Sequence, residues 1–132
     1  MKLKRLLMLL LMGTVSAGAG VYAHHSFAAD YFEEQSVSIE GEVEQFQLKN
    51  PHSLLYVRVK DDKGEPQTFA AEWGGLSRLE RRGVTADTFK PGDFVIVTGS
   101  PGRKASERRI HLKGLHRPSD GWRWPQPQRS SQ

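Results

Sequence analysis

The sequence contains no cysteine. The protein therefore has no disulfide bond, no thiolate metal ligand and no thiol chemistry, so apolar packing must stabilise its core. It also contains no nucleophile elbow and no glycine-rich phosphate loop, the local motifs that position a catalytic nucleophile or a nucleotide. We therefore predict a binding protein rather than an enzyme, and we assign no catalytic residue.

Long apolar runs are also absent, with one exception at the N-terminus. Three basic side chains within the first five residues precede an unbroken apolar run at 6–12. Glycine, serine and threonine dilute residues 13–20, so the segment is a poor membrane-spanning helix. Val21 and Ala23 supply small residues at the positions that a signal peptidase reads. The pattern predicts a Sec-type signal peptide over residues 1–23, cleaved after Ala23, with a mature protein in the periplasm and no transmembrane segment.

An excess of positive charge is lacking once this segment is removed. The whole chain has 19 Lys plus Arg against 15 Asp plus Glu, but three of the cations lie in the signal peptide. The mature chain from His24 onward has a net charge of only +1. Glu40, Glu42 and Glu44 alternate along its first predicted strand and would repel phosphate. A nucleic-acid partner is therefore disfavoured.

The mature chain shows the alternating pattern of short β-strands. Val37, Ile39, Gly41 and Val43 alternate with polar residues, and further strands are expected at 55–60, through Phe69 to Trp73, at 94–98 and at 109–115. The stretch from Leu76 to Gly83 fits a helix of about two turns.

Three strands, one short helix and two strands are the order of an OB-fold. We therefore predict an all-β, five-stranded OB-fold-like barrel over residues 24–117, with the helix between the third and fourth strands. Gly41 supports closure, because a long first strand must bend to serve both sides of a small barrel. An open antiparallel sandwich is the alternative.

Three short motifs resemble a family of small secreted bacterial proteins with an OB-fold-like domain of unknown function. They are His-His-Ser-Phe at residues 24–27, Asn-Pro-His at 50–52 and Lys-Pro-Gly-Asp at 90–93. The resemblance extends from about Ala23 to Leu115. It implies a small exported domain but supplies no activity and no site residue.

The predicted new N-terminus carries the most distinctive chemistry. An α-amino group and the imidazole of His24 together form a chelate ring that favours square-planar Cu(II). His25 or His52 could add another nitrogen ligand. The sequence thus predicts a copper site at His24, His25 and His52, whereas the simpler interpretation leaves the two terminal histidines in solvent.

Two loops of the predicted barrel would flank a ligand-binding face. In an OB-fold these loops join strands one and two and strands four and five. We expect the face to include Asn50, Tyr56, Arg58, Arg103 and Lys104. A metal ion or another small ligand is the predicted partner.

Residues 118–132 differ in composition from the barrel. Prolines and a polar end predict a flexible basic tail that contributes little to stability. Its Trp122, Arg123 and Trp124 are residue types common in interface hot spots. The alternative function is therefore an adaptor that binds a periplasmic protein through the barrel face and this tail.

Overall fold

The computed structural model describes residues 27–126. The chain divides into two units, Met1–Asp30 and Tyr31–Gln132. In the first unit the described residues 27–30 form one helical turn. No described helix has the length and hydropathy needed to cross a membrane. The predicted signal peptide and both terminal histidines lie outside the described residues.

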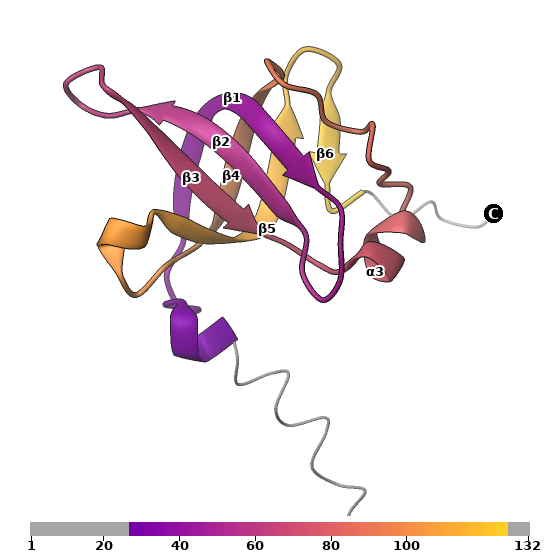
Figure 1. Ribbon diagram of the computed structural model, residues 1–132, viewed down its shortest axis with the longest axis horizontal. Coiled ribbons are helices and arrows are strands. Elements are labelled where there is room, and N and C mark those ends of the chain that lie inside the picture. Colours follow the sequence, from indigo (N-terminus) through magenta and orange to yellow (C-terminus); the bar gives the residue numbers. More distant parts are fainter. Residues whose placement is uncertain (1–26, 127–132) are drawn as a thin grey trace, which may run out of the picture. The chain divides into compact units, whose positions relative to one another are not determined.

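The second unit is a β-barrel with a short helix (Figure 1). Its elements are β1 (Val37–Gln47), β2 (Leu54–Lys60), β3 (Pro66–Glu72), α3 (Leu76–Glu80), β4 (Phe94–Pro101), the 3₁₀ turn η1 (Ala105–Glu107), β5 (Arg109–Arg117) and β6 (Trp122–Trp124). The sheet order is β3-β2-β1-β4-β5-β6. A parallel pairing of Ala70, Ala71 and Glu72 with residues 109–111 joins β3 to β5 and closes the first five strands into a barrel. The predicted five-stranded barrel is confirmed, and the open sandwich is excluded.

Glycine allows neighbouring strands of the barrel to approach closely. A Cβ atom at Gly41 would lie 1.9 Å from the carbonyl oxygen of Arg58 on β2. The same separation applies between a Cβ at Gly99 and the carbonyl oxygen of His111. Gly41 is thus required at the bend of β1, as predicted, and Gly99 has an equivalent role on β4 beside a register shift.

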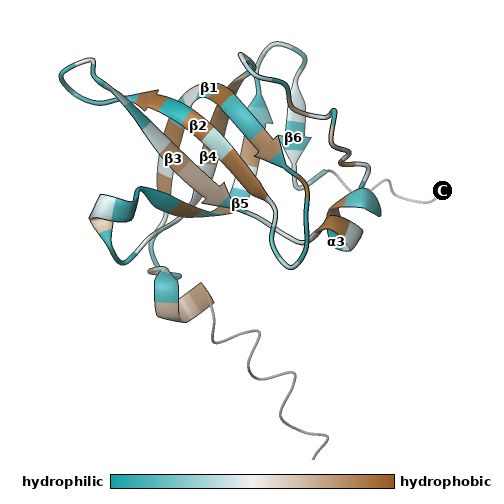
Figure 2. Cartoon of the chain, in the orientation of Figure 1, coloured by the Kyte–Doolittle hydropathy of each residue, from teal (hydrophilic) through white to brown (hydrophobic). Residues whose placement is uncertain are grey.

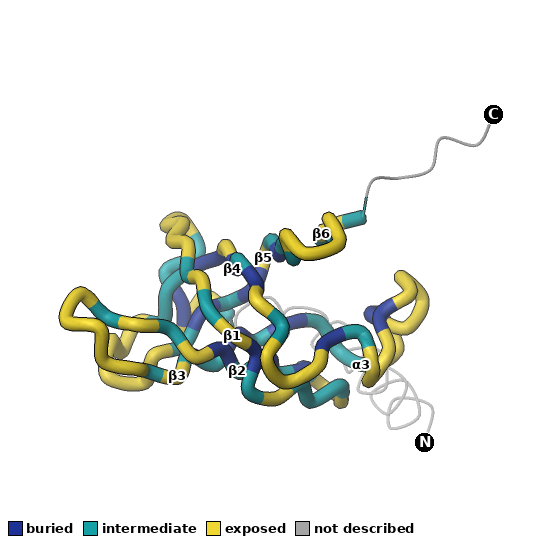
Figure 3. Tube along the Cα trace, turned by 90° about the horizontal axis from the view of Figure 1, so that it is seen from above, coloured by how far each residue is buried: buried dark blue, intermediate teal, exposed yellow. Residues whose placement is uncertain are grey.

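Inward-facing side chains of the five strands form the core. Hydrophobic and hydrophilic residues alternate along β1 and β2 (Figure 2), and buried positions recur along the strands in Figure 3. Val57, Val97 and Ile110 are at most 1% exposed, and Trp73 is 3% exposed. Ile110, Leu112 and Trp73 are therefore core residues.

The helix α3 covers one end of the core. Leu79 is its buried residue, and the following loop contributes buried Val84 and Phe89. The helix is shorter than the two turns expected, because residues 81–83 form turns and Gly83 adopts a φ of 81°. Its position between β3 and β4 is as predicted.

The expectation of a flexible tail is wrong for residues 118–126. Trp122–Trp124 form β6, which pairs antiparallel with Leu115 to Arg117 on β5. The two indoles explain this order. Trp73 makes edge-to-face contacts with Trp122 and Trp124 at centroid distances of 6.4 Å and 4.9 Å. Of the three residues expected to bind a partner, only Arg123 is fully exposed.

Candidate functional site

The loop that carries the Asn-Pro-His motif is fixed against the segment after β3. The Ser53 amide donates to the carbonyl of Gly74, 3.1 Å away, and the Leu76 amide donates to the carbonyl of Lys49 at 3.0 Å. Gly75 allows this contact, since a Cβ there would lie 2.5 Å from the Pro51 carbonyl oxygen. These contacts hold His52 at the end of β3.

His52 belongs to a polar cluster centred on Glu72, the last residue of β3. The His52 Nδ1 lies 2.8 Å from Glu72 Oε1. The other carboxylate oxygen accepts hydrogen bonds from the Tyr31 hydroxyl and from Arg109 Nη2, the latter at 2.6 Å. The Arg109 guanidinium also lies 5.2 Å from the centre of the Tyr31 ring. The Glu72 carboxylate thus connects the β1–β2 loop, β5 and the segment that precedes β1.

These contacts fix the ionisation of the cluster. Burial favours the neutral carboxyl of Glu72, but hydrogen bonds from Tyr31 and Arg109 outweigh it and lower the pKa of Glu72. Burial and the Glu72 carboxylate raise the pKa of the Tyr31 hydroxyl, which stays a donor. Since an ionised carboxylate only accepts, His52 donates through Nδ1.

A second histidine–carboxylate pair adjoins the first. His111 Nδ1 lies 2.8 Å from Glu33 Oε1, and Lys113 Nζ lies 3.2 Å from Glu33 Oε2. The rings of His111 and Tyr31 are 5.6 Å apart. Burial opposes ionisation of Glu33, but hydrogen bonds from His111 and Lys113 lower its pKa. Tyr31 therefore contacts His111 directly and is linked to His52 through the Glu72 carboxylate.

An open hollow of about 420 Å³ lies on the outer face of β2 and β3 beside this cluster. Its lining includes Lys49, His52, Tyr56, Glu72 and Arg109. The hollow combines an oriented imidazole, one carboxylate and two cationic side chains. The imidazole can bind a metal ion, and the cationic side chains can bind a small polar ligand.

The structure brings together only part of the predicted ligand face. His52 and Tyr56 line the same hollow, whereas Arg58 bonds Glu44 at 2.8 Å and lines a different one.

The remaining predicted residues do not line this hollow. The Asn50 side chain faces Gly75. The guanidinium of Arg103 lies 4.5 Å from the centre of the Phe32 ring, and Lys104 forms an ion pair with Glu107 at 3.2 Å.

Three residues of the cluster were missed by sequence reasoning. They are Glu72, Arg109 and Tyr31, of which Glu72 pairs with Arg109 and His52. The predicted barrel order could have indicated this pairing, because the ends of β3 and β5 meet where the barrel closes. Tyr31 gives no comparable signal, since it precedes the strands.

We expect Glu72→Gln to lower the free energy of unfolding by about 2 kcal/mol at pH 7, a typical value for hydrogen bonds to a charged group. Because folding lowers the pKa of Glu72 from about 4.5, its contribution is present above that value and is lost as the pH falls through the lower folded pKa. Urea unfolding of the metal-free proteins should therefore show the two free energies converging as the pH falls below about 4.5. A difference that does not shrink as the pH falls below this value would contradict the assignment.

The residues that form the barrel and the cluster also match a known family model. A search of curated proteins gave no match. The family of unknown function DUF6152 matches residues 12–111, which include the Asn-Pro-His motif, Glu72 and Arg109. The chain therefore belongs to the DUF6152 family.

Proposed function

We propose that the mature protein is an exported periplasmic binding module that holds a metal ion at His52, with Cu(II) as the metal that its N-terminal chemistry favours. The observation that carries the proposal is the 2.8 Å contact between His52 Nδ1 and Glu72 Oε1. Histidines that bind metals through one ring nitrogen usually donate the other N–H to a carboxylate or carbonyl. In this arrangement His52 Nε2 would be the coordinating atom.

Glu72 is itself held in place. Arg109 and the Tyr31 hydroxyl fix its second oxygen, and its side chain is only 13% exposed. A carboxylate fixed from two sides keeps the His52 ring in one orientation. Such preorganisation favours metal binding, because less side-chain entropy is lost when the ligand is held.

The remaining ligands would come from the start of the mature chain. The described residues contain no group of three or more histidine, aspartate or glutamate side chains that could hold a metal ion. After cleavage behind Ala23, the α-amino group and imidazole of His24 would complete the nitrogen set, with His25 as a further candidate.

Chain length is compatible with this assembly. Tyr31, which is anchored to the same carboxylate as His52, follows His24 by seven residues. A segment of seven residues can span up to about 25 Å. In the proposed site such a short tether would raise the effective concentration of the amine.

The protein-interaction alternative has less support. It relied on Trp122, Arg123 and Trp124 as an exposed contact surface, but both tryptophans pack against Trp73.

A Cu(II) competition titration tests the proposal. The mass of the protein recovered from the periplasm should correspond to residues 24–132, and this protein should bind one Cu(II). Retaining Ala23 converts the amine into an amide and should lower the affinity by at least about 100-fold, whereas Glu72→Gln should lower it by about 10-fold to 100-fold.

Two histidine variants locate the site. His52→Ala should cause a loss as large as the one caused by retaining Ala23. His116→Ala is the matched control, because this histidine lies on β5 in a different hollow, and it should leave the affinity unchanged. Equal affinity of the extended and authentic proteins would overturn the copper site. If retaining Ala23 lowers the Cu(II) affinity but His52→Ala does not, the copper site is a chelate formed by the N-terminus alone, without the barrel.

A further inference from the structure

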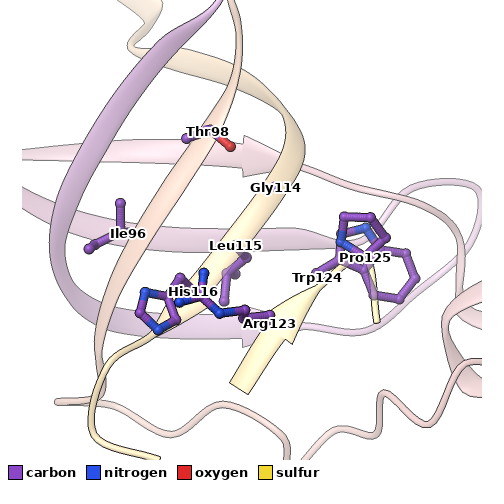
Figure 4. A pocket seen from close by; sticks show the side chains of 8 residues that line it. All are labelled: Ile96, Thr98, Gly114, Leu115, His116, Arg123, Trp124 and Pro125. Atoms are coloured by element: carbon purple, nitrogen blue, oxygen red, sulfur yellow. The ribbon is translucent and has the colours of Figure 1, made fainter. Parts of the chain in front are cut away.

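A second hollow lies on the outer face of β4, β5 and β6 (Figure 4). Its volume is about 340 Å³, and it shares no lining residue with the hollow at His52. We propose that it binds a small organic carboxylate with a flat apolar body. This site is independent of the proposed metal function.

Gly114 on β5 creates the floor of the hollow. It pairs with Thr98 of β4, and a Cβ at this position would lie 2.3 Å from Thr98 Oγ1. Because no side chain occupies the floor, the exposed Thr98 hydroxyl borders open space. A hydroxyl at this position can donate a hydrogen bond to an incoming oxygen.

Two nitrogen-bearing side chains form the polar end. His116 and Arg123 are cross-strand partners on β5 and β6, and both side chains line the hollow (Figure 4). Among the described residues, neither side chain has a hydrogen bond or an ion pair. Arg58, Arg109 and Arg117, in contrast, all pair with acids. A guanidinium binds a carboxylate through two parallel hydrogen bonds, so Arg123 supplies the charge that an acid requires.

The opposite end is flat, apolar and rigid. Trp124 and Pro125 form it (Figure 4), and Trp124 is fixed by its edge-to-face contact with Trp73 at 85°. Trp124 is partly buried against the core, so the part of its ring that stays exposed offers a fixed apolar contact at low entropic cost. This surface selects a planar ligand body over a flexible chain.

Size and local charge favour a small anion. The volume is at the lower end of the range for small-molecule sites. Glu40 on β1 pairs with Ile96, which lines the hollow, but no acidic side chain is among the described residues that line it. A carboxylate placed there meets one cation and two hydrogen-bond donors.

Benzoate is a suitable probe, and benzamide is its uncharged counterpart of nearly the same shape. In amide-detected NMR titrations of metal-free protein comprising residues 24–132, benzoate should cause saturable shifts at Thr98, Gly114 and His116 and at the Trp124 indole. Benzamide should bind at least 10-fold more weakly. Arg123→Gln should weaken benzoate binding at least 10-fold. Arg82→Gln is the control: it removes an exposed arginine that follows α3 and does not line the hollow, and it should leave benzoate binding unchanged.

A second variant tests the shape of the hollow separately from the charge of Arg123. Gly114→Ala fills the floor and should also weaken benzoate binding at least 10-fold while Arg123 remains. The absence of saturable shifts, shifts confined to other residues, or equal benzoate affinity in wild type and Arg123→Gln would each overturn the proposal. Since no copper is present, these outcomes do not depend on the metal site.

Discussion

Replacing both Trp122 and Trp124 with alanine is expected to lower the free energy of unfolding by about 4 kcal/mol, because large-to-small changes of aromatic side chains in packed positions cost 3–5 kcal/mol each when buried. The indoles are partly buried against the core and contact Trp73 and Phe89 through edge-to-face geometry. For a domain of this size the loss corresponds to a decrease in Tm of at least about 15 °C. Thermal and urea unfolding followed by circular dichroism would measure it.

Arg123→Ala is the matched control for this pair. It removes an exposed side chain from the same three-residue strand, between the two tryptophans. The free energy of unfolding should change by less than about 0.5 kcal/mol. If the double tryptophan variant is as stable as this control, β6 does not stabilise the barrel.

Gly99→Ala is expected to destabilise the protein by about 3 kcal/mol, the upper end of the usual cost of overpacking. The added methyl group would lie 1.9 Å from the His111 carbonyl oxygen, which is main chain and cannot rotate away. The β4–β5 pairing must therefore separate. Gly41→Ala should have a similar effect through the Arg58 carbonyl on β2.

Gly74→Ala provides the comparison for these two glycines. A Cβ at this position would lie 3.4 Å from side-chain carbons of Arg78 and Leu79, which is an ordinary contact. Chemical denaturation should show a loss below about 1 kcal/mol. Equal losses at all three positions would show that conformational entropy, rather than close strand approach, determines the cost.

The sequence predicted the barrel chiefly because its first two strands alternate between apolar and polar residues. Val37 to Val43 alternate over seven residues, and a glycine interrupts the pattern at the bend. Period-two alternation reports which face of a strand is buried, so the strand order followed from local information. The closing pairing between β3 and β5 was implied only by analogy with the OB order, since residues 70–72 and 109–111 are far apart in sequence.

The fate of the C-terminal segment could not be predicted in the same way. β6 has only three residues, which is too few for a periodic pattern. Trp122 and Trp124 become ordered because Trp73 and Phe89 offer rings that they can cover. This is a tertiary effect, and neighbouring prolines gave the opposite local signal.

The candidate site was predictable only in part for a related reason. His52 stood out through its motif, but its orienting carboxylate is 20 residues away and Arg109 is a further 37 residues along the chain. The hollow beside β6 was not predicted, because it depends on Gly114 being placed next to Thr98 by strand pairing.

The closure of the barrel links ligand binding to unfolding. Three residue pairs join β3 to β5, and this seam is a shorter pairing than those between the other neighbouring strands of the barrel. The Glu72 cluster lies on the same seam and joins β3 to β5 through Arg109. Local opening of a native protein begins where few interactions must be broken, and here it must also break this ion pair. A ligand that binds the cluster only in the folded state would therefore slow amide hydrogen exchange at residues 70–72 and 109–111. It would also stabilise the whole barrel by an amount that rises with the logarithm of the ligand concentration above its Kd.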